Sequence, residues 1–215
     1  MLDNALKGLT INERVIELDR NQPEFTLTLE EYLGKAVSMT RIKKGRKLQQ
    51  KHNPILSNVE KHYHVQPRFL VALWGIETNY GEYTGGFSVI RSLVTLAYDE
   101  RRSEFFRKEL LLALKIINEK HISAEDMMGS WAGAMGQNQF MPSSFNTYAV
   151  DFNNDGKKDI WNDLEDIFAS SSNYLSSQGW RSDITWGREV RIPDDFCLLY
   201  TSPSPRDATL SGMPS

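Results

Sequence analysis

The chain has 215 residues, of which 40% are hydrophobic and 25% charged, and its formal net charge is −3. These values are ordinary for a soluble globular protein with one domain, or one domain and part of a second. No basic stripe is visible, which argues against nucleic acid as a partner, and no run approaches the roughly 20 apolar residues of a membrane span. The first residues lack a secretory leader. Taken alone this indicates the cytoplasm, but a secreted protein without its leader would look the same.

The first half of the chain reads as a series of helices. Thr28 and Glu31 form a capping box, which predicts a helix that runs through Tyr32 and Ala36. Apolar residues at helical spacing then predict a longer helical stretch, marked by Leu48, Ile55, Leu56, Val59 and Tyr63. Asn53-Pro54 interrupts this stretch, either as a kink or as a cap followed by a proline at the first helical position.

The same reading continues to the end of the helical region. Pro67 opens the next helix, which ends near Gly81 and has an apolar stripe made of Phe69, Leu73 and Ile76. The fourth helix is marked by Phe106, Leu110, Leu114 and Ile117. Residues 127–144 read as a loop, Asp163 caps a final helix that Gly179 stops, and residues 184–192 alternate weakly like a strand. The sequence therefore predicts a mainly α fold with little β structure.

Glu77 stands out as a candidate catalytic acid. It follows the apolar run 69–76 and lies near the end of its predicted helix, where the macrodipole is negative. Both surroundings favour the protonated carboxyl, which suits a general acid. Gly75 and Gly81 are expected to leave room for a bulky substrate beside it. The alternative is an ordinary solvated glutamate at a helix end.

A glycoside hydrolase normally needs a second carboxylate across the bond that it cleaves. Glu82 is close in sequence, but its direction beyond the predicted helix end is not defined by the pattern. A second acid is therefore not assured.

An acidic loop follows the 127–144 segment. Asp151, Asn153, Asp155 and Gly156 match the front half of an EF-hand, with the backbone carbonyl of Lys157 as a further ligand. The twelfth position is Asn162 rather than Glu, so the standard loop is broken, and Asp166 is the candidate that would close the site, ahead of Asp159 and Glu165. The pattern predicts a structural Ca²⁺ site. A solvated Asx turn is the alternative.

Several runs together resemble the membrane-bound lytic murein transglycosylase B family over about residues 11–193. The most specific run is Gly129-Ser-Trp-Ala-Gly-Ala-Met-Gly-Gln-Asn-Gln-Phe-Met-Pro-Ser-Ser144. The others are 15–25, 73–78, 93–98, 101–102, 151–166 and 173–175. The resemblance implies a lysozyme-like helical core. It also implies cleavage of the β-1,4 bond between N-acetylmuramic acid and N-acetylglucosamine in peptidoglycan without water, which leaves a 1,6-anhydro ring.

The resemblance also assigns roles to residues. Glu77 matches the family's single catalytic acid and base, and no cofactor is implied for catalysis. The implied substrate-binding residues are Tyr32, Arg101, Arg102, Ser130, Gln139 and Tyr174. The implied calcium ligands are Asp151, Asn153, Asp155, Lys157 and Asp166. The implied protein is a periplasmic monomer that meets the membrane only through a lipid anchor missing from this chain.

Two other functions stay open at this stage. A muramidase would hydrolyse the same bond and would need a second acid such as Glu82 or Asp99. A non-catalytic module that binds peptidoglycan or calcium would not depend on Glu77.

The C-terminal segment differs in character from the rest. Residues 197–207 read Cys-Leu-Leu-Tyr-Thr-Ser-Pro-Ser-Pro-Arg-Asp, which matches the translation of a transposase adapter used in sequencing libraries. We therefore expect a catalytic domain over residues 1–196, incomplete at its C-terminal end, and an adapter-derived tail over 197–215. The alternative is a disordered terminus rich in Pro and Ser. The only cysteine, Cys197, would then carry no redox information.

Overall fold

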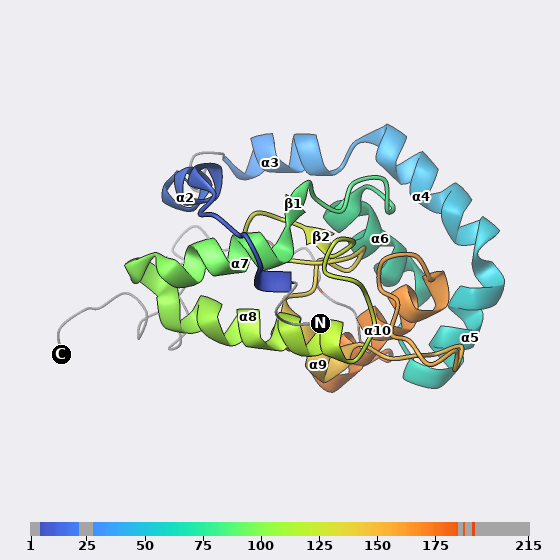
Figure 1. Ribbon diagram of the computed structural model, residues 1–215. Helices are drawn as coiled ribbons and strands as arrows, with labels where there is room; N and C mark the ends of the chain where they lie inside the picture. Colours follow the sequence, from blue (N-terminus) through green and yellow to red (C-terminus); the bar gives the residue numbers. More distant parts are fainter. Residues whose placement is uncertain (1–4, 22–27, 185–186, 188–190, 192–215) are drawn as a thin grey trace, which may run out of the picture. The chain divides into compact units, whose positions relative to one another are not determined.

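The computed structural model describes residues 5–21, 28–184, 187 and 191 (Figure 1). The chain divides into two units, Met1–Ser182 and Asp183–Ser215, and every element below belongs to the first. The strand predicted over 184–192 falls largely, and the tail over 197–215 wholly, outside the described residues.

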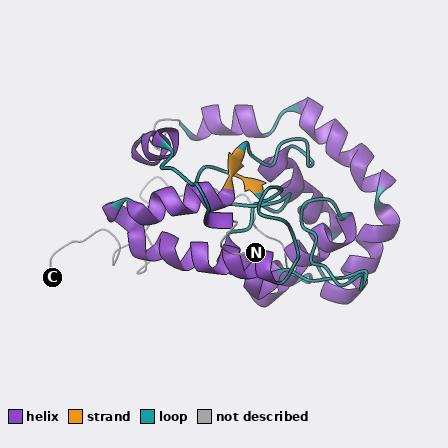
Figure 2. Cartoon of the chain, viewed as in Figure 1, coloured by secondary structure: helices purple, strands orange, loops and turns teal. Residues whose placement is uncertain are grey.

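The described part of the first unit is built from helices and two short strands (Figure 2). In chain order these are α2 (Glu13–Arg20), α3 (Leu29–Ala36), α4 (Met39–Lys51), α5 (Asn53–Tyr63), α6 (Pro67–Thr78), β1 (Phe87–Ser88), α7 (Val89–Tyr98), the 3₁₀ turn η2 (Glu100–Arg102), α8 (Ser103–Asn118), β2 (Met128–Gly129), α9 (Pro142–Tyr148) and α10 (Leu164–Ser177). Of these helices, none combines the length and apolar character that a membrane span requires.

Two helix starts predicted from local signals are confirmed. The Thr28 hydroxyl accepts the Glu31 N–H at 3.3 Å, and the Glu31 carboxylate accepts the Thr28 N–H at 2.9 Å, which completes the capping box of α3. Asp163 accepts the N–H groups of Glu165 and Asp166 at the start of α10. These bonds satisfy backbone donors that a helix leaves without a partner in its first turn.

The interruption at Asn53-Pro54 separates two helices. His52 ends α4 and precedes α5, and Pro54 lies in the first turn of α5, where its missing N–H costs no hydrogen bond. The cap is His52 rather than Asn53, and it makes no capping bond with its side chain.

The predicted apolar stripe of α6 was wrong. The residues that α6 buries are Leu70, Val71, Trp74, Gly75 and Thr78. By contrast, Leu73 is 37% and Ile76 is 50% exposed. Because apolar residues occur all round this helix, periodicity does not distinguish its faces, and the indole of Trp74 is on the face that packs inward.

The segment read as a loop over 127–144 is also partly regular. Residues Met128 and Gly129 form β2, which pairs antiparallel with Ser88 and Phe87 of β1. Helix α9 begins at Pro142, a proline in its first turn. The short strand pair holds the start of the 129–140 segment beside the beginning of α7 (Figure 2).

The buried residues form two clusters. One lies around the antiparallel pair α7 and α8, with α9 and residues such as Met127, Met135 and Phe140 (Figure 1). The other joins α5, α6 and α10 through Leu56, Trp74 and Phe168 among others. Met135 and Phe140 belong to the first cluster, and Trp74 of α6 belongs to the second. The 135–140 segment therefore lies between the first cluster and α6, the helix that carries Glu77.

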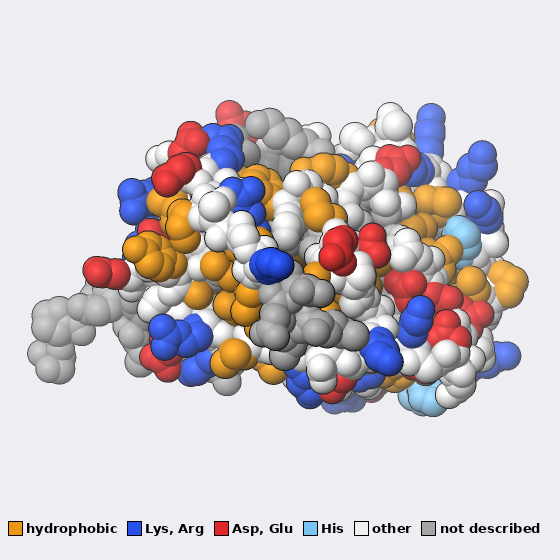
Figure 3. All heavy atoms as spheres, viewed as in Figure 1, with side chains coloured by type: hydrophobic (Ala, Val, Ile, Leu, Met, Phe, Trp, Pro, Cys, Tyr) orange, Lys and Arg blue, Asp and Glu red, His pale blue; other side chains and the backbone are white. Residues whose placement is uncertain are grey.

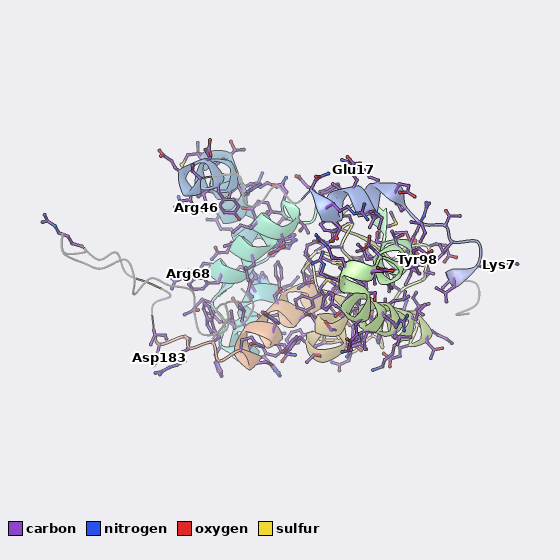
Figure 4. All side chains as sticks on the ribbon, turned by 90° about the vertical axis from the view of Figure 1, so that its left-hand side faces the viewer. Lys7, Glu17, Arg46, Arg68, Tyr98 and Asp183 are labelled. Carbon is purple, nitrogen blue, oxygen red and sulfur yellow. The ribbon has the colours of Figure 1, made fainter. Side chains whose placement is uncertain are left out.

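Helix α2 packs against α7, and Figure 4 shows Glu17 of α2 and Tyr98 of α7 on the same side of the molecule. On the face shown in Figure 3, acidic and basic side chains are interspersed among apolar ones.

Candidate active site

The end of α6 is defined by three residues with left-handed backbone angles. Asn79, Tyr80 and Gly81 have φ values of 52°, 67° and 79°, so the chain leaves the helix directly after Thr78. Glu77 therefore lies in the last helical turn, as predicted, where the backbone carbonyls disfavour a negative charge.

The expectation that Gly75 and Gly81 leave room for a substrate was wrong. A Cβ on Gly75 would lie 2.7 Å from the ring of Tyr80, and a Cβ on Gly81 would lie 2.2 Å from Oε1 of Gln137. The Tyr80 ring turns back over α6, and its hydroxyl donates to the Arg41 carbonyl at 2.7 Å. Both glycines thus allow protein side chains, not a ligand, to approach the helix.

Glu77 opens onto a pocket of about 270 Å³ with largely apolar walls. The lining residues come from α6, the 137–144 segment and α10: Leu73, Trp74, Glu77, Gln137, Asn138, Gln139, Phe140, Met141, Ser144, Ile167, Phe168, Ser171, Tyr174 and Leu175. Among these described residues Glu77 is the only one with an ionisable carboxyl. A pocket with apolar walls and a few polar groups is the usual form of a small-ligand site.

Desolvation by the surrounding protein raises the pKa of Glu77 above its ordinary value of 4.5. Glu77 is nevertheless exposed to solvent, so the shift is smaller than a fully buried carboxyl would show. Within the described part of the chain, Glu77 makes no hydrogen bond or ion pair that would favour its charged form. The Glu77 carboxyl therefore keeps its proton to a higher pH than a free glutamate does, and it lines the pocket.

The candidates for a second acid are engaged elsewhere. Glu82 pairs with Lys44 at 2.7 Å and accepts a hydrogen bond from Asn79. Asp99 pairs with Arg20 at 3.3 Å and caps η2. Neither residue lines the Glu77 pocket.

Two of the substrate-binding residues that the resemblance implied line the pocket with Glu77. Gln139 has a φ of 51°, and its Nε2 donates to the carbonyls of Thr84 at 3.0 Å and Gly136 at 2.9 Å. Tyr174 is 37% exposed, and its ring packs against those of Phe140 and Tyr148.

The other four lie outside that lining. Ser130 follows β2, and its hydroxyl accepts the Ala134 N–H at 3.0 Å. Tyr32 is 52% exposed on α3. Arg101 and Arg102 both form ion pairs with the buried carboxylate of Asp19 on α2, at 2.7 Å for Arg101.

The acidic loop has its oxygen atoms arranged around backbone N–H groups. Asp151 accepts the N–H groups of Asp155 and Gly156, Asn153 accepts that of Asp155, and Asp155 accepts that of Lys157. In the described residues, no three His, Cys, Asp or Glu side chains are gathered closely enough to hold a metal ion. The donor set of carboxylate, amide and carbonyl oxygens nevertheless has the chemistry that Ca²⁺ prefers.

Asp166 connects the two ends of this loop. It is fully buried, and its two oxygens accept the N–H groups of Phe152 and Asp159, each at 2.7 Å. Burial raises its pKa most, the two N–H groups lower it, and the charges of Asp163 and Asp151 raise it further. A buried acid beside other acids is a setting that a cation would stabilise.

Two polar residues of the pocket wall, Gln137 and Asn138, have no role predicted from the sequence. Gln137 accepts the Trp74 indole N–H at 2.7 Å and donates to the Trp161 carbonyl at 2.7 Å. Asn138 donates to the Ile167 carbonyl and lies 2.6 Å from the Ser171 hydroxyl. Their position inside the Gly129–Ser144 run could have marked them as part of the site. The run does not reveal their hydrogen-bond partners, because those are distant in sequence.

The fold and the pocket define a mainly helical protein with one isolated, protonatable carboxyl in an apolar pocket. The family model described as "Transglycosylase SLT domain" matches residues 1–210, a range that includes part of the 197–215 segment. The chain therefore belongs to this transglycosylase family.

Individual relatives agree. The chain is 33% identical over 176 residues to membrane-bound lytic murein transglycosylase B of Escherichia coli (strain K12), covering 79% of this chain and 48% of that protein. The structure of SltB3 from Pseudomonas aeruginosa in complex with NAG-NAM-pentapeptide matches 90% of this chain and 52% of its own, with 47% identity and a TM-score of 0.87. Escherichia coli lytic transglycosylase Slt35 in complex with calcium matches 86% of this chain and 59% of its own, with 30% identity and a TM-score of 0.78.

These matches confirm the predicted helical, lysozyme-like fold. The chain spans about half the length of the curated relative that it matches.

Proposed function

We propose that the protein is a lytic transglycosylase that cleaves the β-1,4 bond between N-acetylmuramic acid and N-acetylglucosamine in bacterial peptidoglycan. Glu77 carries this proposal, because it is the one carboxyl among the described residues of an apolar pocket and its pKa is raised. The relative SltB3 has been captured with NAG-NAM-pentapeptide and with NAG-anhNAM-pentapeptide. Periplasmic action on glycan strands follows from such a substrate.

One carboxyl suffices for the proposed reaction. The protonated Glu77 gives its proton to the glycosidic oxygen as the bond from that oxygen to C1 of the muramic acid breaks. The acetamido oxygen of the same sugar stabilises the positive ring. The Glu77 carboxylate then takes the proton from the 6-hydroxyl as O6 bonds to C1. The carboxyl is restored, no water is consumed, and the product carries a 1,6-anhydro ring.

Other residues of the pocket would bind the sugars in this proposal. Tyr174 and Gln139 offer an aromatic face and an amide beside Glu77, which suits a sugar ring with polar edges. Ser130 and Tyr32 stay proposed substrate contacts on the basis of the family resemblance. For Arg101 and Arg102, the ion pairs with Asp19 favour a structural role over recognition of a peptide carboxylate.

A comparison of two glutamine variants tests the proposed function. The 215-residue chain should release muropeptides with anhydro ends from purified sacculi, and Glu77→Gln should abolish release without lowering the melting temperature. Glu82→Gln is the matched control, because it removes a nearby carboxylate outside the pocket, and it should keep the activity. Reducing ends in the wild-type products, together with loss of activity in Glu82→Gln, would favour a muramidase. A folded chain that releases nothing, or a fully active Glu77→Gln, would contradict the proposal.

We also propose that the acidic loop binds a structural Ca²⁺ through side-chain oxygens of Asp151, Asn153, Asp155 and Asp166 and the carbonyl of Lys157. The calcium complex of Slt35 and the oxygen-rich loop support this. Calcium at about 100 times its Kd would raise the free energy of unfolding by about 2.7 kcal/mol. At about 2–4 °C per kcal/mol for a chain of this size, the melting temperature should rise by on the order of 5–10 °C.

The matched variants for the calcium proposal are Asp155→Asn and Asp126→Asn. The first removes a proposed ligand charge and should reduce the calcium-dependent shift, whereas the second removes an exposed carboxylate outside the loop and should keep it. A melting temperature that is the same in calcium and in chelator would contradict a bound ion.

A further inference from the structure

Gln137 joins the helix that carries Glu77 to residues 160–161, which follow the acidic loop. Its Oε1 accepts the Trp74 indole N–H at 2.7 Å, and its Nε2 donates to the Trp161 carbonyl at 2.7 Å. Its backbone N–H donates to the Ile160 carbonyl at 2.8 Å. The Thr78 hydroxyl lies 3.3 Å from the Gln137 carbonyl. Side chain and backbone therefore bridge the same two segments.

The contacts on α6 fall on both sides of Glu77 in sequence. Trp74 is three residues before Glu77 and Thr78 is one residue after it, and both are buried, with 7% and 1% exposure. On a helix these residues belong to the turn that carries Glu77. A shift of Trp74 or Thr78 would therefore move the Glu77 carboxyl.

The other end of the bridge is itself held in place. The Trp161 N–H donates to the Asp159 carboxylate at 2.9 Å, and the Asp159 N–H donates to buried Asp166 at 2.7 Å. Gln137 also fills the space beside Gly81 where a side chain would otherwise lie. The bridge thus ends on a segment that is anchored through the acidic loop to α10.

We propose that Gln137 is a positioning residue that fixes the last turn of α6, and with it the Glu77 carboxyl, against the 160–161 segment. The inference rests on the proposed function for its kinetic consequence alone. Its geometric consequence, the placement of a carboxyl, is measurable whether or not the chain cleaves peptidoglycan.

Gln137→Met and Gln66→Met form a matched pair. Methionine keeps the length of glutamine and removes its hydrogen bonds. Gln66 precedes α6, at the opposite end from Glu77, and donates through Nε2 to the Ser182 carbonyl at 3.0 Å. Both variants lose a glutamine side chain bonded to a backbone carbonyl, but only the first lies beside Glu77.

Three measurements separate positioning from simple loss of stability. In Gln137→Met, carboxyl NMR should show the pKa of Glu77 falling toward its ordinary value as water reaches the loosened turn. The Trp74 indole N–H signal should move upfield, because its acceptor is lost. The kcat on peptidoglycan should fall by on the order of 10–100-fold with KM nearly unchanged, because misplacement of a reacting group costs rate rather than binding. Gln66→Met should lower the melting temperature without any of these changes.

Trp74→Phe removes the same hydrogen bond from its donor side, and it replaces Gln137→Met in the test if that variant does not fold. It removes the indole N–H and should also lower the Glu77 pKa. The double variant should be no worse than either single variant, because both delete one shared interaction.

An unchanged Glu77 pKa in folded Gln137→Met, or an equal change in Gln66→Met, would overturn the positioning role. An inactive wild-type chain with the expected pKa changes would instead contradict the proposed function and leave the positioning role standing.

Discussion

Asp19→Asn should destabilise the protein far more than loss of an ordinary surface ion pair. The Asp19 side chain is 5% exposed and pairs with both Arg101, which is 53% exposed, and Arg102, which is 42% exposed. These pairs join α2 to the turn between α7 and α8. The asparagine keeps the shape of the side chain but removes the charge that both guanidinium groups share.

The magnitude lies between two limits. Breaking a fully buried pair costs about 3–5 kcal/mol, and breaking an exposed pair costs about 0–1 kcal/mol. Because the carboxylate is buried but the two arginines can turn toward water, we expect a loss of about 1–3 kcal/mol. At about 2–4 °C per kcal/mol, the melting temperature should fall by roughly 2–12 °C.

Thermal unfolding followed by circular dichroism is the assay. Glu104→Gln is the control, because Glu104 is 86% exposed and pairs with Lys108, which is 69% exposed; it should change the melting temperature by no more than about 2 °C. If Asp19→Asn melts together with Glu104→Gln, the inference that Asp19 anchors the two arginines is refuted, and their guanidinium groups are free for the substrate.

Three further predictions concern the helix that carries Glu77 and the end of the chain. The raised pKa of Glu77 means that the folded protein binds its proton more tightly than the unfolded chain, so its contribution to stability is complete at low pH and is lost as pH rises through the folded pKa. Urea unfolding should therefore show Glu77→Gln equal to wild type near pH 4 and more stable near pH 7, by less than about 1 kcal/mol because the group is partly exposed; a gain that shrinks with rising pH would contradict the sign. Gly75→Ala should lower the free energy of unfolding by about 1–3 kcal/mol, since its Cβ meets the Tyr80 ring at 2.7 Å. Gly34→Ala, whose Cβ would have nothing within 4 Å, should raise it by about 0.5–1 kcal/mol. Equal melting temperatures for the two variants would count against the Tyr80 contact. Finally, the codons for residues 197–207 should reproduce the transposase adapter base for base, and a different set of codons would defeat that proposal.

Local signals predicted the helix ends well. The capping box at Thr28, the cap at Asp163 and the break at Asn53-Pro54 depend on groups within a few residues of one another. Such short-range hydrogen bonds and backbone restraints are encoded in the sequence around them. Glu77 could also be identified from the sequence, because an acid after an apolar run near a helix end is unusual by itself.

What the sequence did not reveal depends on contacts between distant segments. The buried face of α6 follows from Trp74 meeting Gln137, which is 63 positions away. The pairing of Arg101 and Arg102 with Asp19 spans more than 80 positions. Neither an apolar helix nor a pair of neighbouring arginines indicates such distant partners. The sequence therefore predicts a different buried face for α6, and a substrate-binding role for the two arginines.

The most direct test of the single-acid account is to digest purified peptidoglycan with the 215-residue chain in water labelled with heavy oxygen. Mass spectrometry then shows whether the new chain ends contain an atom from the solvent. We predict anhydro ends without label, because O6 of the same sugar takes the place of water once Glu77 has accepted its proton. New reducing ends that carry heavy oxygen would contradict it.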